Sequence, residues 1–182
     1  MRTKHIYVAV LLMIMAAWFA QGPTNQAKQI RKDAGTPPPQ GQITTSPAIF
    51  GFNPGEISVG GKCNIEFIND APMSADTYDI ARNHPLKLVG WAMDDQKERL
   101  PQRVIVRFSN SADKHFYVAA RTGLIRDDVR AYFKLSDRIM GAGFDMNLDM
   151  HDLPPGVYSL DLLMQFDDKI DVCDNGRKVN VK

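Results

Sequence analysis

Apolar residues form two patterns in this chain, one unbroken run near the start and alternation with polar residues farther on. The unbroken run covers residues 6–20 and follows Arg2 and Lys4. A charged start followed by an apolar stretch of this length is typical of an export signal. We therefore expect residues 1–21 to be a signal peptide or a signal anchor, and the chain to leave the cytoplasm.

The residues after the run decide between an anchor and a cleaved signal. Signal peptidase requires small residues at positions −3 and −1. Cleavage after Ala20 would place Trp18 at −3, and cleavage after Gly22 would place Pro23 at +1. The poor cleavage site favours an uncleaved anchor in the inner membrane that holds a periplasmic domain. The run is short for a spanning helix, which needs ~20 apolar residues, so cleavage and secretion remain the alternative.

Residues 22–47 show no apolar periodicity and are rich in Pro, Gln, Thr and Gly. A segment of this composition cannot bury enough apolar surface to offset the entropy of ordering its backbone. The three consecutive prolines at 37–39 favour an extended spacer. The sequence therefore predicts a disordered Pro/Gln-rich linker between the signal and the rest of the chain.

From residue 48 to residue 182 the pattern changes to period two, which predicts strands with one buried face. The clearest strands are 143–150 and 157–166, where apolar and polar residues alternate. The segment 86–94 is apolar on both faces and is expected to be central. Further strands are expected at 63–67, 103–108, 116–120 and near 179–181. Seven or eight short strands separated by turns favour an all-β, immunoglobulin-like sandwich.

Turn residues and one helical segment complete the expected fold. Residues 110–113 predict a hairpin loop, Leu153-Pro154-Pro155-Gly156 predicts a break before a strand, and Asp174-Asn175-Gly176 predicts a tight hairpin. Between residues 127 and 133 the apolar residues have helical spacing, and acidic residues stand at the start, as is favourable at a helix N-terminus. We expect a short helix there that crosses between the sheets.

The chain contains two cysteines, Cys63 and Cys173. In an oxidising compartment two well-separated cysteines usually pair. The bond would join the first strand to the penultimate one. Cys173 shares its strand face with Asp171 rather than with Ile170 and Val172, so we expect a bulge or an edge position to bring it to the core. Two buried free thiols are the alternative.

No catalytic motif is recognisable, and no cofactor is expected. The histidines outside the signal, His84, His115 and His151, lack the close spacing of zinc ligands and are expected at the surface.

Four aspartates near the end of the chain are most simply a solvated acidic turn, with calcium binding as the minor alternative. They are Asp167, Asp168, Asp171 and Asp174. An enzyme acting on envelope sugars would need paired carboxylates. The candidates are Asp94, Asp95, Asp127 and Asp128.

Aromatic residues are the candidates for ligand contact, because an aromatic face offers apolar area at a low entropy cost. Trp91 lies in the most apolar strand, and we expect it to pack in the core of the sandwich, as in immunoglobulin-like domains. Tyr117 has the strand parity of Arg121 and is expected to be the most exposed aromatic residue. We therefore predict that Tyr117, Arg107 and Arg121 contact a ligand.

Four segments in this order resemble a bacterial extracytoplasmic β-sandwich domain that is appended to membrane glycosyltransferases of the dolichyl-phosphate-mannose type. They are Gly90-Trp91-Ala92-Met93-Asp94, Arg126-Asp127-Asp128-Val129, Ala142-Gly143-Phe144 and the stretch at 153–160. The resemblance covers residues 86–182. It implies an accessory role near envelope glycans or glycolipids, and it assigns no catalytic residue. The chain departs from that setting in lacking a polytopic catalytic part.

The sequence leaves two functions open. The first is a non-enzymatic, envelope-tethered module that binds a partner protein or a surface glycan, and the second is the carboxylate-dependent enzyme. In residues 48–182 acidic side chains slightly outnumber basic ones. Nucleic-acid binding would need a basic surface, so we do not expect a nucleic-acid partner.

Overall fold

The computed structural model describes residues 40–182. The predicted signal or anchor at 1–21, and the predicted linker up to residue 39, lie outside the described residues. Among residues 40–182, no helix has both the length and the apolar character needed to cross a membrane.

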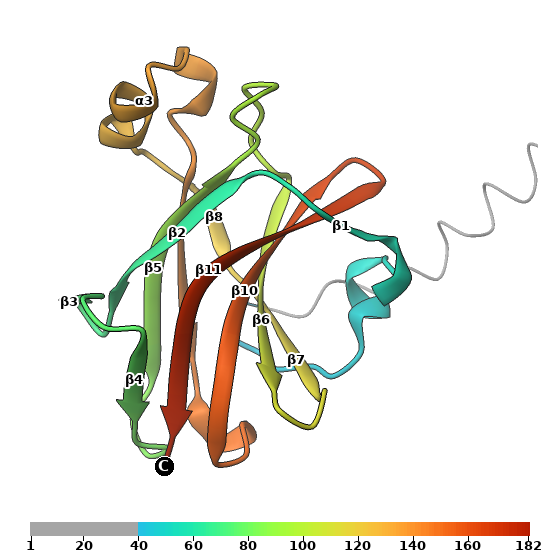
Figure 1. Ribbon diagram of the computed structural model, residues 1–182, viewed down its shortest axis with the longest axis vertical. Helices are drawn as coiled ribbons and strands as arrows, with labels where there is room; N and C mark the ends of the chain where they lie inside the picture. The colour runs from blue at the N-terminus through green and yellow to red at the C-terminus, as the bar shows by residue number, and fades with distance from the viewer. Residues whose placement is uncertain (1–39) are drawn as a thin grey trace, which may run out of the picture. The chain divides into compact units, whose positions relative to one another are not determined.

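The described residues form two β-sheets, which confirms the all-β sandwich with one short helix (Figure 1). The first sheet has the order β1-β11-β10-β6-β7, with β4 also pairing to β11. Its strands are β1 (Ile57–Val59), β4 (Thr77–Ile80), β6 (Arg103–Asn110), β7 (His115–Ala119), β10 (Gly156–Phe166) and β11 (Lys169–Val181). The second sheet has the order β3-β2-β5-β9-β8, so β5 is central as expected. Its strands are β2 (Lys62–Ile68), β3 (Ala71–Pro72), β5 (Leu86–Met93), β8 (Arg121–Leu124) and β9 (Gly143–Leu148).

The main core lies between the two sheets and is formed by the apolar faces that the period-two pattern predicts. All five apolar residues of one face of β10 are buried there: Tyr158, Leu160, Leu162, Met164 and Phe166. From the second sheet, β9 contributes Phe144, Met146 and Leu148. The hydroxyl of Tyr158 donates a hydrogen bond to the carbonyl oxygen of Pro154 (2.8 Å), which holds the proline turn against the start of β10.

A second apolar cluster covers the outer face of the first sheet. Phe50, in the 3-10 helix η1 (Pro47–Phe50), and Phe52 pack there against Ile105, Tyr117 and other side chains of the sheet. This cluster explains why Ile105 interrupts an otherwise polar face. The covering segment begins before residue 48, because the backbone of Thr44 pairs with that of Tyr117. Residues 40–47, which the sequence placed in the linker, are therefore part of the packed domain.

One extra residue in β2 changes which side chains face outward. Ile65 pairs with Gly90 and Phe67 pairs with Val89, so Glu66 is the additional residue of a β-bulge. The bulge reverses the alternation, so Phe67 is exposed instead of sharing the inner face with Cys63 and Ile65 as regular alternation would place it. Glu66, which has outward parity with Asn64, and Phe67 therefore both face outward.

Another irregularity lies in β11, where a hairpin was predicted at Asp174-Asn175-Gly176. That prediction is wrong, because β11 runs through these residues and pairs with β10 on both sides of a register shift. Gly176 has a φ of 68°, and the side chain of Asn175 donates to the carbonyl oxygen of Leu160 (2.8 Å). The hairpin between β10 and β11 instead turns at Asp167 and Asp168.

The disulfide Cys63–Cys173 joins β2 of the second sheet to β11 of the first, with its Cα atoms 6.1 Å apart. Ile170 and Val172 pack on the outer face of the first sheet, beneath the segment that carries Phe50. Cys173 has the opposite strand parity and therefore faces the main core. The bond indicates an oxidising, extracytoplasmic compartment. Since β11 is continuous, the bond reaches the last strand rather than the penultimate one.

The predicted helix is confirmed as α3 (Asp127–Phe133), but it does not cross between the sheets. It connects β8 to β9, and these strands are neighbours in the second sheet. Figure 1 shows α3 at the upper end of the domain, opposite the C-terminus. The C-cap residue Lys134 ends the helix in the left-handed conformation (φ 55°).

The other predicted turns agree with the structure. Residues 110–114 close the β6–β7 hairpin, and β10 begins at Gly156 after the two prolines. The strand count is higher than the seven or eight expected, because β1, β3, β4 and β8 have at most four residues each. Strands this short contain too few alternating positions to be recognised from the sequence.

The close approach of β2 and β5 at the bulge predicts a strict size limit at Gly90. A Cβ atom there would lie 2.8 Å from a ring carbon of Phe144 and closer still to the carbonyl oxygen of Asn64. We expect Gly90→Ala to lower the free energy of unfolding by about 1–3 kcal/mol, as overpacking does. Urea denaturation measures this change. Gly55→Ala is the control, because no atom lies within 4 Å of a Cβ at that exposed position. Equal stabilities of the two variants would contradict the crowding.

Candidate functional site

The residues predicted to contact a ligand do not gather at one place. Tyr117 is only 1% exposed, so the prediction that it is the most exposed aromatic residue is wrong. Its ring contacts Phe52 edge-on, with the ring centroids 6.2 Å apart. Burial raises the pKa of its hydroxyl. The side chain does point away from the main core, as its strand parity requires, but the segment after residue 40 covers it.

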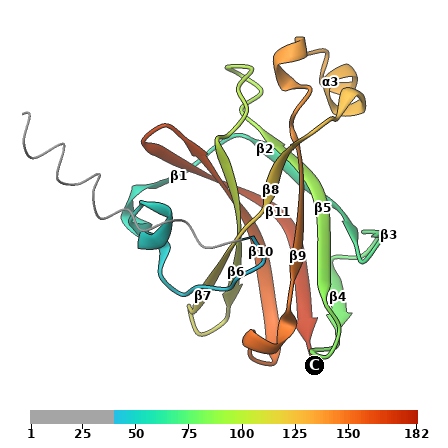
Figure 2. The same cartoon turned by 180° about the vertical axis from the view of Figure 1, so that it is seen from behind.

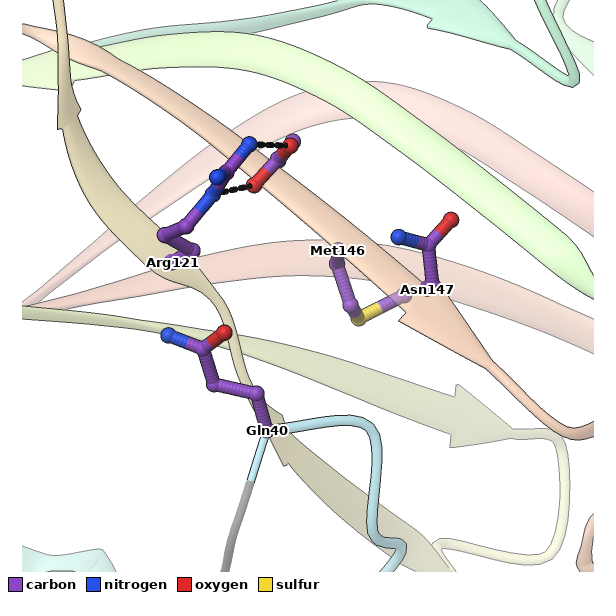
Figure 3. A pocket seen from close by; sticks show the side chains of 5 residues that line it. Gln40, Arg121, Met146 and Asn147 are labelled. Carbon is purple, nitrogen blue, oxygen red and sulfur yellow. Dashed lines mark hydrogen bonds and ion pairs between the residues drawn. The ribbon is translucent and has the colours of Figure 1, made fainter.

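Arg107 lies beside Tyr117 on the same outer face and is held by Asp161, with Nη2 2.8 Å from the carboxylate oxygen. Arg121 is on β8 in the other sheet, where it forms two hydrogen bonds to Asp145. Figure 3 shows this pair beside a shallow polar groove of about 330 Å³, which Gln40, Met146 and Asn147 also line. The groove carries no aromatic side chain, and its cation is already paired.

The four aspartates considered for an enzyme are all paired with basic side chains. Asp95 bonds to Lys62 (2.8 Å) and Asp127 to Arg130 (2.7 Å). Asp94 is 7% exposed and lies 3.4 Å from Arg99, and Asp128 is bonded to Arg126 (2.6 Å). Asp127 and Asp128 belong to α3, and Asp94 and Asp95 follow β5 at the start of the β5–β6 loop. Figures 1 and 2 show that α3 and this loop lie at the same end of the domain.

The remaining polar candidates are dispersed. His84 and His151 are exposed, and His115 is partly buried, with Nδ1 2.9 Å from the hydroxyl of Ser109. Asp167 and Asp168 form the β10–β11 turn, whereas Asp171 and Asp174 lie within β11. Within residues 40–182, no group of three or more His, Cys, Asp or Glu side chains is arranged to hold a metal ion.

A hollow lies between α3 and the outer face of β2 and β5, and we call it the α3 groove. Its volume is about 560 Å³, within the range of about 300–1,000 Å³ that is usual for small-ligand sites. It is lined by Cys63, Asn64, Glu66, Trp91, Asp128, Val129, Tyr132 and Phe133. The sequence singled out Asp128 and Cys63 for other reasons and did not indicate that these residues come together.

Three aromatic side chains form one side of the α3 groove. Trp91 is partly buried on the outer face of the second sheet, so its predicted place in the sandwich core is wrong. The inner face of β5 is occupied by Leu86, Leu88 and Ala92. Trp91 packs edge-on against Phe133, with the centroids 5.3 Å apart, and Phe133 packs edge-on against Tyr132 at 4.9 Å.

A network of charges forms the other side of the groove. The guanidinium of Arg126 bonds to Glu66 on the β2 bulge (2.7 Å) and to Asp128 in the first turn of α3 (2.6 Å). Glu66 also accepts a hydrogen bond from the indole N–H of Trp91 (3.0 Å). Arg126 is 16% exposed, and its hydrogen bonds to Asp128 and Glu66 raise its pKa, so its charge is permanent.

The groove combines an aromatic surface with fixed polar groups, which is the composition of a binding site. Tyr132 is 80% exposed at the rim, and Asn64 faces the groove opposite Trp91 on the neighbouring strand. Two sequence signals bore on this site: the aromatic residues considered for ligand contact, of which Trp91 was assigned to the core, and the apolar spacing of residues 129, 132 and 133, which predicted the helix but not what it covers.

A scan of the chain against protein-family models gave no match, and a search among curated proteins gave none either. The resemblance to the domain appended to glycosyltransferases therefore stays a prediction.

The charge network predicts how Asp128 titrates. The hydrogen bond from Arg126, followed by its charge, lowers the pKa of Asp128 from 3.8 to about 2. Because this pKa is depressed in the folded protein, the pair stabilises the fold above pH 3.8, and that contribution is lost as the pH falls through about 2. We expect Arg126→Gln to return the pKa of Asp128 towards 3.8. NMR titration of the carboxyl carbon measures both values.

Arg130→Gln is the matched control for this titration. It breaks the neighbouring pair with Asp127, so the pKa of Asp128 should not move. A pKa of Asp128 near 3.8 in the unmodified protein would show that Arg126 does not hold it.

Proposed function

We propose that this chain is a non-enzymatic accessory module of the cell envelope that binds a surface glycan through the α3 groove. The N-terminal segment at 1–21 would hold it in the inner membrane as an uncleaved anchor. The domain at 40–182 would then project into the periplasm, in agreement with its disulfide.

The observation that carries the proposal is the α3 groove itself. It places an exposed aromatic ring, Tyr132, next to hydrogen-bonding groups that ion pairs with Arg126 hold in position. The two sheets beneath it are tied by the disulfide of Cys63, which itself lines the groove. Preorganised polar groups beside an apolar surface bind ligands with a small loss of entropy.

The ionised state of Asp128 favours binding over catalysis. A glycosidase needs one carboxyl group that is protonated at the working pH to act as the general acid. Asp128, the one aspartate of the four that lines the groove, has its pKa lowered to about 2 by Arg126 and carries no proton near neutral pH.

Capture of envelope glycans tests this function. The full chain, purified with its N-terminal segment in detergent and immobilised, is incubated with glycans released from the envelope of the source cells. We expect glycan to be retained and to be recovered at its original chain length, as measured by size-exclusion chromatography and mass spectrometry. The Arg121→Ala variant should retain the same material, because the polar groove beside Arg121 shares no lining residue with the α3 groove.

Four results would count against the proposal. Shortened or modified glycans would indicate an enzyme, and retention of an envelope protein without glycan would indicate a protein-binding module. Failure of the unmodified chain to retain any glycan would exclude glycan binding. Loss of retention in Arg121→Ala would move the site away from the α3 groove.

A further inference from the structure

We infer that the ligand of the α3 groove is an uncharged saccharide, with one sugar ring lying on Tyr132 and its hydroxyl groups bonded to Asn64, Glu66 and Asp128. The inference rests on the proposed glycan binding and adds the chemical class of the glycan and its contacts. It follows from how the aromatic and charged groups of the groove are already engaged.

Tyr132 has the exposure and support that a stacking ring needs. The ring is 80% exposed, and its one aromatic neighbour among the described residues, Phe133, meets it in a T-shaped contact, which can cover at most one face of the Tyr132 ring. Phe133 is itself fixed by Trp91 and by the ammonium group of Lys62, which lies 4.9 Å from its ring centroid. An exposed aromatic face covers the C–H surface of a sugar ring at a low entropy cost, because a tyrosine side chain has few rotatable bonds.

The polar groups of the groove match hydroxyl groups. Each carboxylate oxygen of Glu66 and Asp128 can accept more than one hydrogen bond, so acceptor sites remain beside those used by Arg126. The amide of Asn64 can both donate and accept, and it makes no side-chain hydrogen bond to another residue within 40–182. Hydroxyl groups, which also donate and accept, fit such a set without bringing a charge.

Charged sugars fit less well. An anionic sugar would meet the carboxylates of Glu66 and Asp128, and the nearby cations are already paired, Arg126 with both carboxylates and Lys62 with Asp95. A cationic amino sugar would have to compete with Arg126 for the carboxylates of Glu66 and Asp128, which already form ion pairs with its guanidinium.

An array of defined oligosaccharides tests the inference with the full chain in detergent. The array contains neutral sugars, sugars with carboxylate or phosphate groups, and sugars with free amines. We expect binding to neutral members, and calorimetry then measures the Kd of the best one. Tyr132→Ala should weaken that Kd about tenfold, which corresponds to about 1.4 kcal/mol. Asn64→Ala should weaken it about fivefold, as expected for one lost hydrogen bond.

Phe67→Ala is the matched control, because Phe67 is an exposed aromatic residue on the outer face of the same sheet and does not line the groove. Its Kd should equal that of the unmodified chain, and thermal melting should show that all three variants are folded. Equal Kd values for Tyr132→Ala and the unmodified chain would overturn the inferred contacts.

The pattern on the array separates this inference from the proposed function. Binding only to acidic or only to amine-bearing sugars would overturn the uncharged ligand and leave glycan binding in place. Binding to no member, together with no capture of envelope glycans, would overturn both.

Discussion

The guanidinium of Arg126 links two parts of the chain that are sixty residues apart, and the α3 groove depends on this link. On one side is Glu66, on the outer face of β2, and on the other is Asp128 in the first turn of α3. A helix of seven residues has little stability of its own in water. Its position over the second sheet must therefore come from these ion pairs and from the apolar contacts of Val129 and Phe133.

The ion pair between Glu66 and Arg126 and the disulfide Cys63–Cys173 both hold strand β2. Cys63 and Glu66 are three residues apart in β2, so the strand is joined to the first sheet by the disulfide and to α3 through Arg126. On a loop-entropy model, a disulfide that closes about 100 residues contributes about 4–5 kcal/mol, an upper figure that strain reduces. The groove thus stands on a strand whose two faces are both fixed, which is what preorganised binding requires.

Sequence patterns predicted the parts of the fold that follow regular alternation. The inner faces of β9 and β10, the central place of β5, the helix at 127–133 and the Cys63–Cys173 bond all follow from periodicity or residue type. The errors occur where a second layer covers an outer face. Tyr117 has the parity of an exposed residue, but the segment with Phe50 buries it, and Trp91 faces outward beneath α3. The local pattern of apolar and polar residues does not indicate which distant segment will cover the outer face of a sheet.

The candidate site could not be predicted from the sequence for a related reason. Asn64, Glu66 and Trp91 have outward parity, but nothing in the local pattern indicates that α3 lies over them, and the bulge that exposes Phe67 leaves almost no trace in an alternating pattern. The Asp174-Asn175-Gly176 motif shows the converse, because a sequence typical of a hairpin serves as an irregularity inside a long strand. Both cases show that register is set by pairing with neighbouring strands as well as by the local sequence.

A double-mutant cycle between Glu66 and Arg126 tests most directly whether their contact holds α3 to the second sheet. The free energy of unfolding is measured for the unmodified chain, Glu66→Gln, Arg126→Gln and the double variant. Because both side chains are partly buried, we predict a coupling energy of about 1 kcal/mol or more. Additive effects, within about 0.3 kcal/mol, would show that the two side chains act independently and would contradict a groove held together by their contact.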